Sequence, residues 1–252
     1  MRFRAAIFVL ALSARAARAG ETPCWFDNGA IIVPAAFGDM AGDFILDLSA
    51  ARSVLHVTAA QEAGIETPSA RASLRLAGLR RARFEMRIGD ISDREGGLVT
   101  SLVGIIGADA LAGEVVDIEA APCRVRIERR ARRLARAARL PVRWIDGVPA
   151  VRAAISDGRT SRAGWFAIDT GRLGARIADA TLTRAPPPEA GDTPARLRAL
   201  SVAGRLYENI PAGLGASMGL AGSIGEGAWS RYRMRLDLRR GWLQLGAPHP
   251  AR

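Results

Sequence analysis

The sequence predicts a mostly β chain that folds as two similar lobes. Short apolar runs are interrupted by turn residues, including many of the 27 glycines and 13 prolines, as is typical of strand-rich folds. A length of 252 residues with 49% hydrophobic composition is enough to bury one large core or two ordinary ones. The order of motifs in the first half of the chain also recurs in the second half.

Residues 1–19 have the pattern of an export signal. Basic residues at the start precede an apolar run over residues 5–12, and Ala17-Arg18-Ala19 offers a cleavage site with small residues before Gly20. The run is too short to span a bilayer as a mature helix, and an ordinary N-terminal helix is the alternative reading. We therefore expect an exported protein, periplasmic or secreted, with no integral membrane segment in the mature chain.

The two cysteines, Cys24 and Cys123, are candidates for a disulfide in an oxidising compartment. Such a bond would connect the start of the first repeat to its end. Two cysteines and two distant histidines, His56 and His249, do not form a set of metal ligands. We expect no metal and no cofactor.

The net charge of +11 comes from arginine alone, because the chain contains no lysine. Clustered arginine attracts phosphate, but a uniform use of arginine indicates a compositional bias of the source more than a binding site. Acids such as Asp90 and Asp93 interleave with the basic residues, and no nucleic-acid recognition motif accompanies the charge. We expect no nucleic-acid partner.

In the first half, residues 20–128, apolar runs separated by Gly turns predict strands over 30–33 and 43–46 and an extended segment over 53–57. The cap and composition of residues 58–63 predict a short helix, which Gly64 ends. Period-two alternation then predicts a hairpin from 73–76 and 82–88. After Gly104-Ile105-Ile106-Gly107, a closing strand pair is expected over 114–119 and 123–127.

Residues 129–141 form an Arg- and Ala-rich segment with helical leanings that ends at Pro141. We interpret it as a solvated linker between the lobes; contact with an anionic surface is the alternative.

The second half, residues 142–252, repeats the order of the first. Strands are expected over 142–145, 148–151 and 165–168, a hairpin over 196–202 and 206–210, and a closing pair over 232–238 and 241–245. Asp47 and Asp169 lie 122 positions apart, and Gly107 and Gly225 lie 118 apart. Similar offsets for two landmarks predict an internal duplication.

Each half therefore presents an acid at the end of an apolar strand, Asp47 in the first and Asp169 in the second. Two carboxylates that meet cannot both ionise cheaply, so they share a proton. The ionised one can take a proton from a water while the other donates to a carbonyl oxygen, which hydrolyses an amide without a metal. Taken singly, Asp47 is as readily a structural acid that caps backbone N–H groups.

These residues resemble the aspartic proteases of the pepsin and retropepsin type, in particular a bacterial, two-lobed form. The resemblance rests on Asp169-Thr170-Gly171 after an apolar strand and on Ile105-Ile106-Gly107 and Ser223-Ile224-Gly225 downstream. It implies a two-lobed double-ψ β-barrel fold, Asp47 and Asp169 as the catalytic dyad, Thr170 bonding between the lobes, and Gly171 permitting a tight turn.

The first motif departs from the family pattern, because Leu48 and Ser49 follow Asp47 where the family has Thr or Ser and then Gly. One cross-lobe hydroxyl is missing, and Ser49 lies one place too late to replace it. The resemblance implies an aspartic endopeptidase with a peptide or protein substrate in the cleft between the lobes. A catalytically inactive peptide-binding module is the alternative. We expect a monomer, because one chain holds both halves.

Overall fold

The computed structural model describes residues 20–130, 132–178, 195–215 and 219–248. It is mostly β, as predicted, with one 7-stranded and one 12-stranded sheet. The expected export signal lies outside the described residues. Among the described residues, no helix is long and apolar enough to cross a membrane.

The first lobe is the 7-stranded sheet, in the order β2-β3-β4-β8-β5-β7-β6. β3, near one edge of this sheet, pairs with β6 at the other edge, so the sheet curls into a barrel. Its strands are β2 (Trp25–Asp27), β3 (Ala30–Phe37), β4 (Met40–Leu46), β5 (Val54–His56), β6 (Ser69–Leu76), β7 (Leu79–Gly89) and β8 (Gly104–Ile106). Its short helices are α1 (Val57–Glu62), α2 (Ser92–Glu95) and α3 (Ala108–Leu111).

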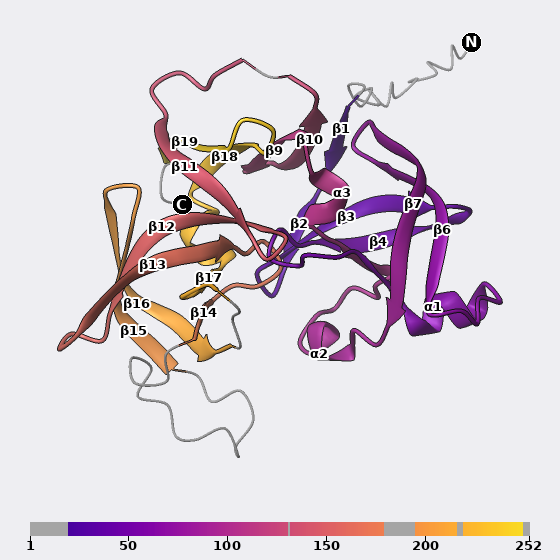
Figure 1. The fold of residues 1–252 in the computed structure, drawn as a ribbon, viewed down its shortest axis with the longest axis horizontal. Helices are drawn as coiled ribbons and strands as arrows, with labels where there is room; N and C mark the ends of the chain where they lie inside the picture. Colours follow the sequence, from indigo (N-terminus) through magenta and orange to yellow (C-terminus); the bar gives the residue numbers. More distant parts are fainter. Residues whose placement is uncertain (1–19, 131, 179–194, 216–218, 249–252) are drawn as a thin grey trace, which may run out of the picture.

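The second lobe repeats this plan and lies on the opposite side of the molecule, at the left of Figure 1. Its elements are β12 (Val148–Ser156), β13 (Ser161–Ile168), β14 (Ala175–Ile177), β15 (Ala195–Val202), β16 (Arg205–Leu214), β17 (Gly222–Ile224) and the 3-10 turn η3 (Glu226–Ala228). Here β12 pairs with β15 to curl the sheet.

The two lobes share strand pairings as well as strand order. In the first, β4 runs parallel to β8 with Phe44 opposite Gly104; in the second, β13 runs parallel to β17 with Phe166 opposite Gly222. In both, the next short strand is antiparallel to the glycine-containing strand and parallel to the second hairpin strand. The duplicated order in the sequence corresponds to a duplicated structure.

A third layer joins the lobes. The closing strand pair of each half was predicted, but the joining of both pairs in one sheet was not. The layer has the order β1-β10-β9-β18-β19-β11 and continues into β12. Its strands are β1 (Glu21–Pro23), β9 (Val115–Ala120), β10 (Cys123–Glu128), β11 (Ala138–Ile145), β18 (Tyr232–Asp237) and β19 (Trp242–Pro248). Within this layer the two halves meet in the antiparallel pair β9–β18, across which buried Asp117 pairs with Arg233 and Arg235. Figure 1 shows this layer at the top centre of the view.

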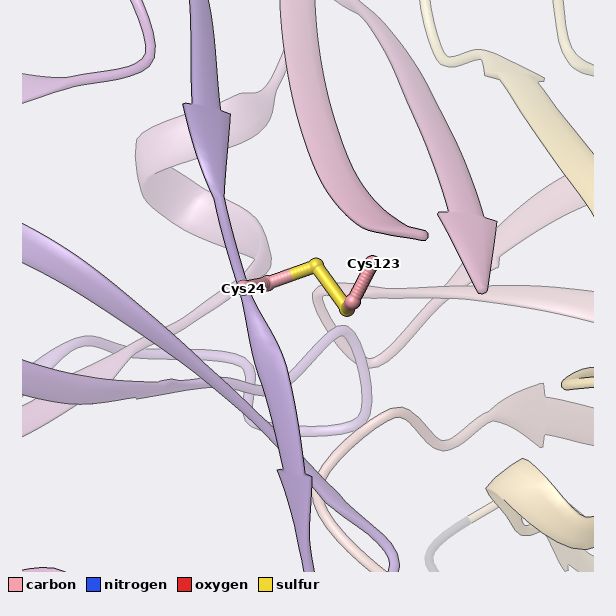
Figure 2. The surroundings of a disulfide bond; sticks show 2 residues. All are labelled: Cys24 and Cys123. Atoms are coloured by element: carbon pink, nitrogen blue, oxygen red, sulfur yellow. A yellow bond between two sulfur atoms is a disulfide. The ribbon is translucent and has the colours of Figure 1, made fainter. Parts of the chain in front are cut away.

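The predicted disulfide is present between Cys24 and Cys123, with an S–S distance of 2.01 Å and 99 residues of separation. Figure 2 shows it bridging the chain between β1 and β2 to the start of β10. It therefore encloses the whole first lobe.

The helical leaning predicted for residues 129–141 is wrong. The described part of this segment has no helix, and Ala138 already begins β11, which contains Pro141. Residues 138–141 pair with β19, and Arg139 lies 3.4 Å from the ring centroid of Trp242. Sheet pairing and this contact with an aromatic face outweigh the helix propensity of Ala and Arg.

Candidate active site

Asp47 and Asp169 occupy equivalent positions at the ends of equivalent strands. Asp47 follows β4 and its N–H donates to Ile106 O at 3.0 Å; Asp169 follows β13 and its N–H donates to Ile224 O at 2.9 Å. Both side chains are buried, at 0% and 2% exposure. The parallel strands β8 and β17 therefore fix where each acid leaves the sheet.

The two carboxylates meet at Gly171. Its N–H donates to Asp169 Oδ1 at 3.0 Å, and a Cβ placed on it would lie 2.7 Å from Asp47 Oδ2 and 2.3 Å from Arg94 Nη2. Any side chain here would push the two turns apart. A glycine at this position allows a buried acid from each lobe to reach the same point.

Thr170 bonds across the lobes. Its hydroxyl donates to Leu46 O at 2.6 Å and accepts from Leu48 N–H at 3.0 Å. Its carbonyl accepts from Ile31 N–H at 2.9 Å. One buried hydroxyl thus forms hydrogen bonds with two backbone groups of the opposite lobe, which is the role that the resemblance implied.

Leu48 and Ser49 have different roles. Leu48 is fully buried and apolar, so the first lobe returns no hydroxyl toward the second. Ser49 instead supports its own acid: its N–H and its hydroxyl donate to Asp47 Oδ1 at 2.8 and 2.7 Å. The Ser49 N–H is the counterpart of the Gly171 N–H, and its hydroxyl adds a donor that the second lobe lacks there.

Arg94 is the site residue that the sequence did not indicate. Its Nη2 donates to Asp47 Oδ2 at 2.6 Å and to Gly171 O at 3.2 Å, and its side chain is only 13% exposed. It comes from α2, in the long connection between β7 and β8. Arg94 lies 47 positions from Asp47 among mixed charges, so no local pattern singles it out.

The α2 connection is held at several points. Glu95 follows Arg94, and its Oε2 lies 3.3 Å from His56 Nε2. Further along, the N–H groups of Val99 and Thr100 donate to Asp27 Oδ2 at 2.8 Å each. These contacts to two other parts of the first lobe position the arginine over the dyad.

Asp169 has neutral hydrogen-bond donors where Asp47 also has a cation. Besides Gly171 N–H, the Ser223 hydroxyl donates to its Oδ2 at 3.0 Å. Burial, followed by the charge of Asp47, raises the pKa of Asp169 to about 7, although Arg94 and the Ser223 hydrogen bond oppose the shift. At mildly acidic pH Asp169 is therefore a proton donor beside a carboxylate that is paired with arginine.

Two cavities adjoin the dyad. One of about 600 Å³ is lined by residues that include Ser49, Arg94, Asp169 and Ser223. The other, of about 390 Å³, is lined by residues that include Arg94 and Gly171. Groups from both lobes line each cavity, so the site lies in a cleft between them. Among the described residues, no three side chains of metal-binding type gather.

No family model and no curated protein sequence matches the chain. Among solved structures, the chain is similar to the crystal structure of the aspartic proteinase from Irpex lacteus. The TM-score is 0.55 with 11% identity, over 91% of this chain and 97% of that one. Identity this low shows the fold alone, which is the two-lobed double-ψ β-barrel fold of the pepsin-like proteinases, as the sequence predicted.

Proposed function

We propose that this chain is an aspartic-type endopeptidase that hydrolyses peptide bonds with a water held between Asp47 and Asp169. The observation that carries the proposal is the meeting of two buried acids from equivalent strand ends at Gly171. Burying two carboxylates together is costly unless their charges are compensated or used. A cleft between the lobes at the same place gives a peptide access to them.

The environments of the two acids assign their roles. Asp47, paired with the Arg94 guanidinium, is the base that takes a proton from the water as the water oxygen attacks the carbonyl carbon. Asp169, with its pKa raised to about 7, donates its proton to the carbonyl oxygen. When the tetrahedral intermediate collapses, the nitrogen leaves with the proton held by Asp47, and the diol returns a proton to Asp169.

The proposal extends to location and assembly. An export signal over residues 1–19 and a disulfide that encloses the first lobe support a periplasmic or secreted protein. Two lobes within one chain support a monomer.

Purified protein starting at Gly20, incubated with a mixed peptide library from pH 4 to pH 8, tests the activity. We expect cleavage that declines above about pH 7, because Asp169 loses its proton there. Asp169→Asn should lower kcat/KM by on the order of 10²- to 10⁴-fold. Asp39→Asn, an equal change at an exposed turn, should leave cleavage unchanged. Absence of cleavage at every pH, or equal cleavage by Asp169→Asn, would contradict the enzyme proposal.

A peptide-binding module without cleavage is the second candidate. The contact that favours it is Arg94 on Asp47 Oδ2, because a neighbouring cation weakens a carboxylate as a base. The lack of a hydroxyl at Leu48 favours it too. Peptide binding with equal affinity by the parent protein and Asp169→Asn, without products from the parent, would identify this function.

A further inference from the structure

Three arginines stand where the two cavities adjoin. Arg94, Arg172 and Arg176 line both the cavity of about 600 Å³ and the cavity of about 390 Å³. Arg172 directly follows Gly171, and Arg176 lies on β14 just beyond. The turn that carries Asp169 therefore also carries two of the three cations.

Arg172 is weakly compensated among the described residues. Whereas Arg94 contacts Asp47 at 2.6 Å, Arg172 Nη2 approaches Asp93 Oδ2 only to 3.9 Å, and the Asp93 side chain is 75% exposed. The Arg172 side chain itself is only 28% exposed. Burial, followed by the charges of Arg94 and Arg176, lowers its pKa.

Arg176 is held in place by backbone. Its Nη1 donates to Leu214 O at 2.8 Å, and a Cβ on Gly215 would lie 3.0 Å from its Cβ and 3.2 Å from its Cδ. The glycine lets the arginine stem lie flat along the end of β16. A guanidinium ordered in advance loses less entropy when it binds a ligand.

Among the described residues, three acids line these cavities. Asp169 and the exposed Asp146 line the larger cavity, and Asp93 lines the smaller one. Asp169 already accepts from Gly171 and Ser223. Of these acids, Asp93 pairs with Arg172 at 3.9 Å, so a bound carboxylate can approach the Arg172 guanidinium more closely than Asp93 does.

We propose that Arg172 and Arg176 form a subsite for a carboxylate side chain, so that the cleft selects peptides with Glu or Asp next to the residue placed over the dyad. This inference rests on the proposed peptide-binding role of the cleft and deepens it. Arginine suits the task because its planar donors match both oxygens of a carboxylate. The closeness of Arg172 to Asp169 in the chain places the bound acid beside the reacting centre.

Binding is tested with Asp169→Asn protein, so that no peptide is cleaved during the measurement. Fluorescence anisotropy compares labelled peptides that are identical except for Glu or Gln, with the varied residue moved along the peptide. At one position we expect Glu to bind about tenfold or more tightly than Gln, the effect of hydrogen bonds to a charged group. Added Arg172→Gln should abolish the preference, and Arg172→Lys should restore part of it.

Arg80→Gln is the matched control, because Arg80 is exposed on β7 and lines neither cavity. It should keep the preference for Glu. Equal binding of Glu and Gln peptides, a preference that survives Arg172→Gln in protein with an unchanged melting temperature, or no binding of any peptide would overturn the proposal. A preference for Glu without cleavage by the parent protein would instead support the subsite and contradict only the endopeptidase.

Discussion

The two aspartate turns have matching backbone hydrogen bonds, but different side chains contact the two carboxylates. Each acid follows an equivalent strand, and each accepts an N–H from the second residue after it, Ser49 or Gly171. On the remaining oxygen, Asp47 receives a guanidinium and Asp169 receives the Ser223 hydroxyl. The duplication fixes where the carboxylates lie, and side chains outside the motif decide which one carries the charge.

A second difference lies in the bonds between the lobes. The Thr170 hydroxyl forms hydrogen bonds with two backbone groups of the first lobe. Leu48 has no hydroxyl that could bond in the same way to the second lobe. Among the residues of the two turns, one cross-lobe hydroxyl is therefore present where the symmetric plan would have two.

Removing Arg94 should have the largest effect on this comparison. In Arg94→Met, Asp47 remains buried beside Asp169 without its cation, and breaking a buried pair costs about 3–5 kcal/mol. We expect that loss in urea unfolding at pH 8. Because Arg94 lowers the pKa of Asp169, the alkaline limb of peptide cleavage should also move upward from pH 7.

Arg71→Met is the matched control for Arg94→Met. Arg71 contacts Glu85 at the same 2.6 Å, but the two side chains are 65% and 50% exposed. Solvent screens such a pair, so its loss should cost at most about 1 kcal/mol. Equal losses in the two variants would contradict the view that Arg94 compensates a buried charge.

Removing the Thr170 hydroxyl should have the next largest effect. Thr170→Val keeps the shape but leaves Leu46 O and Leu48 N–H without their partner, at about 1–3 kcal/mol for each buried group. Urea unfolding should show a total loss of about 2–5 kcal/mol. Thr67→Val, which removes an exposed hydrogen bond to Ser69 O, should change stability by under about 0.5 kcal/mol; a similar change in both would argue against the cross-lobe role.

The acids after the glycine motifs that end at Gly107 and Gly225 give the third contrast. In the first lobe, Asp109 accepts from the Ser53 N–H and hydroxyl. In the second, Glu226 is buried, and its Oε1 has no hydrogen-bond partner among the described residues. Burial raises the pKa of Glu226 from 4.5 to about 7, against a smaller opposing effect of Ser230.

Glu226→Gln should therefore stabilise the protein at alkaline pH. The folded chain holds the Glu226 proton more tightly than the unfolded chain, so its contribution to stability is full below about pH 4.5 and is lost as pH rises through 7. Thermal unfolding at pH 8 should show a gain on the order of 1–3 kcal/mol for Glu226→Gln and little change at pH 4. A gain that is equal at both pH values would contradict the assignment.

Much of the lobe structure follows from local pattern. Apolar runs ending at Gly turns predicted β3, β4 and the two hairpins, and the repeated order located both acids. The pattern works here because each lobe buries one face of its strands and turns where glycine permits positive φ, as at Gly78 and Gly204.

The parts that the sequence did not predict depend on contacts between distant segments. Arg94 meets Asp47 only after α2 is anchored by His56 and Asp27. The pairing of β9 with β18 joins Met234 to Ile118, far apart in the chain. Residues 138–141 form a strand because they pair with β19. Their own sequence does not indicate this pairing.

The β9–β18 pair also bears on how the chain is made. Chains generally fold from the N-terminal end as they emerge during synthesis, and the disulfide partners of the first lobe are both present by residue 123. The outer edge of β9, however, stays unpaired until Tyr232–Asp237 of the second half have been made. Until then β9 presents an open strand edge with Val115, Val116 and Ile118, the kind of edge that recruits another chain. The nascent protein is thus most exposed to aggregation when half of it is already folded, and completion of the last strands removes the hazard.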